Sequence, residues 1–180
     1  MTSRIRYTSF PRTEPPPAYI DSVIAVFRSH EKRISTISRR KGLTSDEVLA
    51  ALREDLVALG FDIEGSKRRA DKILRPVFFG ENGEPELQHE VDGYHGEWRC
   101  GLEVEAGRAW MGNAIYRDLV QALTMVQVDT LLLAVANAYK YKSGGRSVSS
   151  PDYDHACKVA NALYGHTRVD MPYSLVVIGY

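Results

Sequence analysis

Four acidic residues in the middle of the chain have the types and the spacing for metal chemistry. Glu103 and Glu105 alternate with apolar residues, so on a β-strand the two carboxylates project from the same face. Glu90 and Asp92 alternate in the same way in the segment just before them. A two-residue turn at 96–97 would pair the segments as a hairpin, with Glu90 opposite Glu103. Asp92 would then be a diagonal neighbour of Glu103, at about 7–8 Å between Cα atoms.

Carboxylates gathered on one face repel one another, and a bound cation relieves that repulsion. Oxygen ligands without thiolates or clustered imidazoles favour Mg²⁺, Mn²⁺ or Ca²⁺ over zinc. Cys100 and Cys157 lie far apart and have no zinc-ligand spacing, so we expect two small buried residues there. The alternative is that the four acids are only the solvated side of a hairpin.

The acidic segment around Asp92 and Glu103, with the helix and strand patterns that follow it, resembles the PD-(D/E)xK nuclease core. Val91-Asp92 is followed by ten residues, then by Glu103-Val104-Glu105, Gly107-Arg108 and the pattern of a helix and an apolar strand. The segment GLEVEAGRAWMGNAIYRDLVQ is most similar to BglII- and BamHI-like restriction endonucleases. The resemblance covers roughly residues 74–137.

The resemblance implies that Asp92 and Glu103 bind Mg²⁺ or Mn²⁺, with Glu90 as a further candidate ligand. The third position of the motif is usually lysine and acts on the attacking water; here it is Glu105, as in BamHI-like members. Val91 replaces the usual proline. The family also implies an accessory acid from an earlier helix, for which Glu54 is the candidate, since Glu47 has a capping role of its own.

Basic residues that would hold a DNA backbone lie outside this acidic stretch. The candidates for DNA contact are Arg39, Arg40 and Lys41, then Arg108 after the acidic strand, and finally Lys140, Lys142 and Arg146. Solvated surface residues are the alternative for each group, and a flexible connection is the alternative for 140–146. Tyr116 and Gln121 are further candidates for DNA contact, and His95 is more typical of an incidental turn residue than of a general base.

The hydrophobic pattern predicts the elements that must position these residues. Helices are expected over 18–31, from a capping box at Thr44 and Glu47 to Gly60, over 113–127, and from Ser150-Pro151 to Gly165. Strands are expected over 74–79, 87–95, 99–106, 131–136 and 174–178. The strand at 131–136 is apolar at every position, which indicates a central strand covered on both faces.

This order predicts a single α/β domain over 1–180, with a restriction endonuclease-like core and a mixed central sheet flanked by helices on both faces. Its expected parts are a proline-rich arm at 1–17, a helical part at 18–60, the nuclease-like core at 74–137, and a C-terminal helix and strand at 151–180. Lacking a membrane span or secretory signal, the chain is expected to be cytoplasmic.

Three functions are compatible with these residues. The first is a Mg²⁺-dependent DNA endonuclease that acts as a homodimer, because the strands of a duplex are related by a two-fold axis. The second is a DNA-binding or protein-interaction module that keeps the nuclease fold without catalysis, which the replaced lysine and the balance of 23 basic and 23 acidic residues favour. The third is a metal-dependent hydrolase of small phosphate esters.

Overall fold

A six-stranded mixed sheet forms the centre of the molecule. The computed structural model describes residues 3–38, 42–66, 68–107, 109–110 and 112–180. The strand order of the sheet is β1-β10-β7-β6-β5-β2. Its strands are β1 (Arg6–Phe10), β2 (Asp62–Ile63), β5 (Gly93–His95), β6 (Cys100–Glu105), β7 (Thr130–Val135) and β10 (Ser174–Gly179). Strands β6, β7 and β10 are parallel, and β1, β5 and β2 pair antiparallel to their neighbours.

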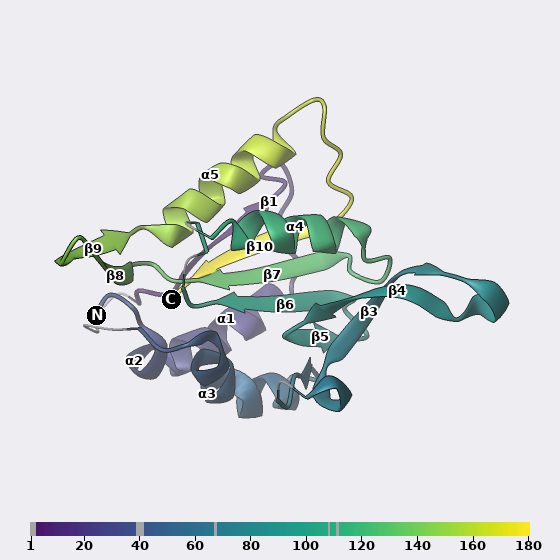
Figure 1. Cartoon of the computed structure of the whole chain (residues 1–180), viewed down its shortest axis with the longest axis horizontal. Helices are drawn as coiled ribbons and strands as arrows, with labels where there is room; N and C mark the ends of the chain where they lie inside the picture. Colours follow the sequence, from purple (N-terminus) through teal and green to yellow (C-terminus); the bar gives the residue numbers. More distant parts are fainter. Residues whose placement is uncertain (1–2, 39–41, 67, 108, 111) are drawn as a thin grey trace.

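Helices cover both faces of this sheet, as the sequence predicts (Figure 1). One face carries α1 (Ile20–Ser29), the short α2 (Glu31–Ile34) and α3 (Ser45–Ala58). The other carries α4 (Ala114–Thr124) and α5 (Asp152–Tyr164). The capping box of α3 is present: the Thr44 side chain accepts from the backbone N–H of Glu47, and the Glu47 carboxylate accepts from the backbone N–H of Thr44.

Strand β7 shows why helices are needed on both sides. All six of its residues are buried. Leu132 and Ala134 pack with the α1 and α3 layer, whereas Leu131, Leu133 and Val135 pack with the α4 and α5 layer. The continuous apolar run from Leu131 to Val135 therefore serves two cores, one on each face of the sheet.

Three segments differ from the sequence-based expectation. The expected arm at 1–17 contains the edge strand β1, which pairs with β10. Residues 140–146, for which a flexible connection was the alternative, lie in a hairpin of β8 (Tyr139–Ser143) and β9 (Arg146–Ser150), which turns through Gly144 and Gly145 with positive φ angles. These strands were not predicted from the sequence. The partner of β1 is remote in the sequence, and the residues of the β8–β9 hairpin are mostly polar.

The strands expected over 74–79, 87–95 and 99–106 are divided between two sheets. Strands β3 (Ile73–Phe79) and β4 (Pro85–Val91) form a separate two-stranded sheet that projects from the body (Figure 1). Two short 3-10 turns, Arg69–Asp71 and Glu81–Gly83, flank β3. Within the described residues, no helix is both long enough and apolar enough to cross a membrane.

Candidate active site

Strand β6 directs its two acids toward α4. Cys100, Leu102 and Val104 are buried in the core beneath α1 and α3. Because side chains alternate along a strand, Glu103 and Glu105 project to the opposite face, where α4 lies. The shared face predicted for these two acids is therefore present, and it faces a helix that covers part of the sheet.

Asp92 is held against the same strand. It lies in a bend between β4 and β5, and its Oδ2 accepts a hydrogen bond of 2.8 Å from the backbone N–H of Val104. Strand β5 pairs with β6 with Gly93 opposite Leu102. Continuing this register by one residue sets Asp92 opposite Glu103.

The two-residue turn predicted at 96–97 is wrong. Four residues, 96–99, connect β5 to β6, and Arg99 takes a positive φ of 48°. His95 pairs with Cys100, so the register is displaced by two residues from the predicted one. A displacement by two residues preserves the face of every side chain, so Asp92 and Glu103 still share a side, opposite each other instead of diagonal.

Glu90 belongs to an ion-pair network at the edge of the site. The Nζ atom of Lys72 lies 2.8 Å from a carboxylate oxygen of Glu64 and 3.2 Å from one of Glu90. Glu64 follows β2, and its backbone N–H donates to the carbonyl oxygen of Asp92. Glu64 and Lys72 could not be assigned to the site from the sequence, because the two residues meet the acidic strands only after β2 pairs with β5.

Helix α4 adds two charged residues that the sequence analysis also missed. Nη2 of Arg117 lies 2.6 Å from Oε1 of Glu105 and 2.8 Å from Oδ1 of Asp118. Asp118 is buried, and its Oδ2 has no hydrogen-bond partner among the described residues. The sequence did carry a signal: Asp118 occupies a position on the buried stripe of the helix beside Ile115 and Leu119, where a carboxylate is unusual.

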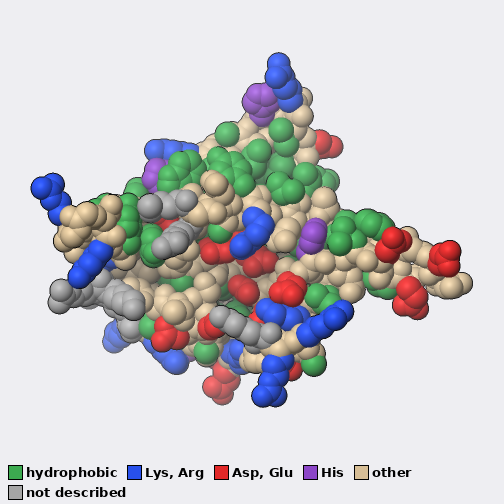
Figure 2. Space-filling view, viewed as in Figure 1, with side chains coloured by type: hydrophobic (Ala, Val, Ile, Leu, Met, Phe, Trp, Pro, Cys, Tyr) green, Lys and Arg blue, Asp and Glu red, His purple; other side chains and the backbone are tan. Residues whose placement is uncertain are grey.

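These residues line one open pocket of about 660 Å³. Its acidic side chains are those of Glu64, Glu90, Asp92, Glu103, Glu105 and Asp118, and its lysine and arginine are Lys72 and Arg117. Figure 2 shows acidic side chains gathered at the centre of this face, with basic side chains among them and to either side. The pocket has a strong excess of negative charge.

Burial and mutual repulsion alter the acidity of these groups. Burial raises the pKa of Asp92 to about 6, with further contributions from Glu64 and Glu105. Burial, then Asp92 and Asp118, raise the pKa of Glu103 well above its usual value. Burial and Asp118 raise the pKa of Glu105 to about 7. Burial likewise raises the pKa of Asp118. Two groups that titrate near neutral pH in one pocket, Asp92 and Glu105, are typical of functional sites.

The donor set suits a hard divalent cation, because carboxylate oxygens predominate. The unpartnered Oδ2 of Asp118 is a buried oxygen that such a cation could satisfy. As the side chains stand, no three His, Cys, Asp or Glu side chains of the described residues are close enough to share an ion. Binding by three acids would therefore require side-chain rotation, and Glu105 would have to separate from Arg117.

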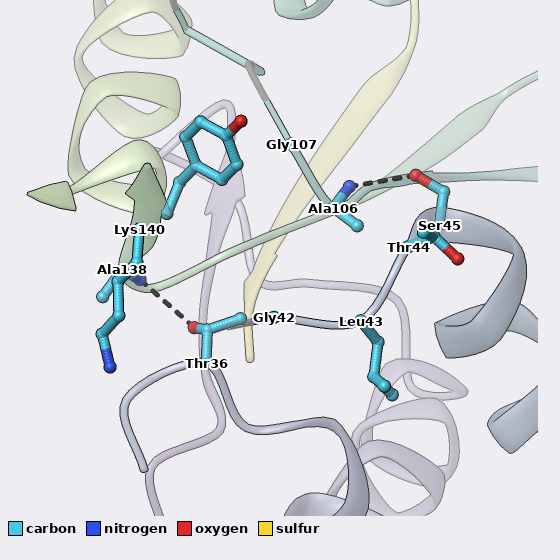
Figure 3. A pocket seen from close by; sticks show the side chains of 10 residues that line it. Thr36, Gly42, Leu43, Thr44, Ser45, Ala106, Gly107, Ala138 and Lys140 are labelled. Atoms are coloured by element: carbon cyan, nitrogen blue, oxygen red, sulfur yellow. Dashed lines mark hydrogen bonds between the residues drawn. The ribbon is translucent and has the colours of Figure 1, made fainter. Parts of the chain in front are cut away.

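A second pocket, of about 340 Å³, adjoins the acidic one at Ser45, which lines both. The Ser45 hydroxyl accepts a hydrogen bond from the backbone N–H of Ala106, which ties the end of β6 to the start of α3 (Figure 3). On the other side of this pocket, the Thr36 hydroxyl accepts from the backbone N–H of Ala138. The first bond fixes the segment that follows β6, and the second fixes the segment that follows β7.

Some predicted site residues lie elsewhere. Glu54 is exposed on α3 and is absent from the lining of the acidic pocket, so its predicted role as accessory acid is not supported. Glu47 serves the helix cap. His95 is buried, stacks on Trp98, and has its Nε2 3.0 Å from the carbonyl oxygen of Leu59, so it is a structural residue of the turn.

The candidates for DNA contact lie in different parts of the structure. Lys142 and Arg146 are exposed on the β8–β9 hairpin, whereas Lys140 donates to the carbonyl oxygen of Ile37. Gln121 lines the acidic pocket, and Tyr116 is exposed on α4. The remaining candidates, Arg39, Arg40, Lys41 and Arg108, lie outside the described residues.

Comparison with known proteins identifies the architecture. No protein-family model matches the sequence, and no curated protein matches it closely enough to count as a relative. Among solved structures, the chain is similar to restriction endonuclease BglII, whose crystal structure was determined in complex with a DNA 16-mer. The match has a TM-score of 0.51 at 11% sequence identity, and covers 98% of this chain and 75% of that one. The chain therefore has the α/β fold of a restriction endonuclease.

Proposed function

We propose that this protein is a Mg²⁺-dependent endonuclease that hydrolyses phosphodiester bonds in DNA. The observation that carries the proposal is the joint presence of Asp92, Glu103 and Glu105 in one open pocket of a restriction endonuclease-like fold. The structurally similar endonuclease BglII was solved with DNA bound, which supports DNA as the substrate.

Each acid has a role that its surroundings support. Asp92 and Glu103 lie on facing backbone segments and would hold Mg²⁺ or Mn²⁺ between them, with Glu90 at the rim as a further ligand. The bound ion would supply positive charge to the phosphodiester under attack. Glu105, with a pKa of about 7, is suited to orient water and accept a proton from it at neutral pH.

DNA would contact the face around the acidic pocket. Lys142 and Arg146 project from a two-stranded hairpin, and neither forms an ion pair with another described residue. We infer that they bind phosphate groups on one side of the pocket, together with Lys140. Arg39, Arg40, Lys41 and Arg108 stay predictions for the same role.

We infer that the active form is a homodimer, because symmetric cleavage of a duplex needs two active sites. Exposed apolar residues on α4, namely Tyr116, Val120 and Leu123, are a candidate surface for a second copy. Figure 2 shows hydrophobic side chains gathered on this side of the molecule. Light scattering would test this: Val120→Glu should convert a dimer to a monomer, whereas a wild-type monomer at working concentration would contradict it.

The direct test is cleavage of supercoiled plasmid with Mg²⁺, with and without EDTA. Wild type should cleave only with the ion, and Glu103→Gln should lose cleavage while keeping its thermal stability. The exposed Glu54→Gln variant is the matched control and should cleave like wild type. Cleavage by Glu103→Gln at the wild-type rate would exclude the proposed site.

One observation favours a second candidate function, a DNA-binding or protein-interaction module without catalysis. Glu105 stands where related nucleases usually have lysine, and Arg117 already neutralises it. Such a module would bind DNA with the usual salt dependence and would show no heat on titration with Mn²⁺. Mn²⁺ binding that depends on Asp92 would favour the endonuclease.

A further inference from the structure

One arginine supplies the positive charge for the inner part of the acidic pocket. Nη2 of Arg117 contacts Oε1 of Glu105 at 2.6 Å and Oδ1 of Asp118 at 2.8 Å, and its Nε lies 2.9 Å from the same Oδ1. The guanidinium therefore joins a carboxylate on β6 to a carboxylate on α4. The other cation of the described lining, Lys72, is paired with Glu64 and Glu90 at the rim.

The two sides of this contact differ in exposure. The Asp118 side chain is 1% exposed and that of Glu105 is 16% exposed, whereas that of Arg117 is 58% exposed. The acids are fixed by the packing of β6 and α4. The guanidinium lies at the mouth of the pocket on a long flexible stem, and it can leave without opening the core.

Arg117 does not satisfy all of the buried oxygens. Oδ2 of Asp118 is buried without a hydrogen-bond partner in the described part of the chain. The Glu105 carboxyl can share a proton with Asp118 while one of the two groups is protonated, and a cation could take the place of that proton once both are ionised. A divalent ion at this position would lie close to the guanidinium, and the two like charges would compete for Glu105.

We propose that Arg117 is the resident cation of the metal-free site, and that it leaves Glu105 and turns to a DNA phosphate when a divalent ion enters. This inference rests on the proposed function. It assigns to Arg117 a positioning role toward the phosphate, while Glu105 keeps the role toward water that the motif normally gives to lysine. Arginine is suited to this exchange, because its planar fork matches carboxylate and phosphate groups equally well.

The first test measures Mn²⁺ binding by calorimetry at about pH 8, above the pKa values of Asp92 and Glu105. Arg117→Gln should bind Mn²⁺ about tenfold more tightly than wild type, because a competing positive charge is gone. Arg168→Gln removes an exposed arginine away from the pocket and should bind like wild type. Equal or weaker binding by Arg117→Gln would overturn the proposal.

The second test uses the wild-type protein, so it does not depend on the folding of a variant. Phenylglyoxal modifies free guanidinium groups, and mass spectrometry reports the rate at each arginine. The rate at Arg117 should rise when Mn²⁺ is added, while the rate at Arg168 stays constant as the internal reference. An Arg117 rate that does not change with saturating Mn²⁺ would overturn the exchange.

The third test examines the phosphate contact through plasmid cleavage at saturating Mn²⁺. Arg117→Gln should cleave about tenfold more slowly than wild type despite its tighter metal binding, and Arg117→Lys should recover part of the rate. Tighter binding with an unchanged rate would refute the phosphate contact. If neither wild type nor Arg117→Gln bound Mn²⁺, the proposed endonuclease function would fail as well. If wild type bound Mn²⁺ and cleaved DNA but Arg117→Gln bound Mn²⁺ no more tightly, only the role of Arg117 would fail.

Discussion

Oδ2 of Asp92 accepts a 2.8 Å hydrogen bond from the backbone N–H of Val104, the residue between Glu103 and Glu105. This bond fixes a carboxylate from the bend between β4 and β5 against the strand that carries the other two acids. It leaves Oδ1 of Asp92 available for another contact. The Asp92 side chain therefore has a structural role, as a hydrogen-bond acceptor, that does not depend on its charge. A conservative substitution can remove the charge and keep the acceptor.

Replacement Asp92→Asn should preserve the fold and abolish activity. The amide oxygen can still accept from Val104, but the negative charge is lost. We expect plasmid cleavage to fall by about two to three orders of magnitude, the scale of losing one electrostatic group from an active site. Thermal denaturation should show a Tm equal to or above that of wild type, because a buried charge has been removed. A variant that cleaves normally would show that Asp92 is outside the chemistry.

The stability of the metal-free protein should fall as the pH rises from about 5 to about 8. The folded-state pKa values of Asp92, about 6, and Glu105, about 7, lie above their unfolded values. The native state therefore binds more protons than the unfolded state in this window, and stability is lost as these carboxyls ionise. We expect a contribution of about 3–4 kcal/mol from the two groups, or roughly 6–16 °C in Tm.

The pH effect has an internal control. In Asp92→Asn one of the two titrating groups is absent, so the loss of stability between the two pH values should be smaller than in wild type. Added Mn²⁺ should stabilise wild type more at the higher pH, because ligation requires ionised carboxylates. A pH profile identical in both proteins would contradict the assignment of this effect to Asp92.

Lys72 should be important for stability, because it neutralises an acid that is largely buried. The Lys72 and Glu64 side chains are 17% and 12% exposed, whereas that of Glu90 is 59% exposed. Lys72→Met would leave Glu64 unpaired and should cost about 3 kcal/mol in urea denaturation. Glu90→Gln should cost about 0.5 kcal/mol or less, as is usual for an exposed pair. The double variant Lys72→Met/Glu64→Gln should recover most of the loss; no recovery would refute the coupling.

The β8–β9 hairpin should contribute electrostatically to DNA binding. The double variant Lys142→Ala/Arg146→Ala should weaken binding to duplex DNA at low salt. It should also reduce the slope of log affinity against log salt by about 1.8, the value for two lost phosphate contacts. Fluorescence anisotropy over a salt series gives both quantities. Lys158→Ala/Arg168→Ala, with the same loss of charge at exposed positions on and after α5, should bind like wild type.

Several features of the fold and the site could be predicted from the sequence because they depend on local periodicity. The alternation around Glu103 and Glu105 placed both acids on one face of β6, and the continuous apolar run over 131–135 identified the central strand β7. The α3 cap at Thr44 and Glu47 was likewise confirmed. The shared face of Asp92 and Glu103 survived the wrong turn, because the register error was an even number of residues.

Only the tertiary structure decided which other residues surround these acids. Glu64 and Lys72 reach the site because β2 pairs with β5, and Arg117 and Asp118 reach it because α4 packs over β6. Strand β1 exists because β10 offers it an edge from the far end of the chain. The sequence by itself determined which face each side chain takes, since that is set by backbone geometry within one element. Which elements then meet depends on packing between segments distant in the chain, and local sequence patterns do not predict that packing.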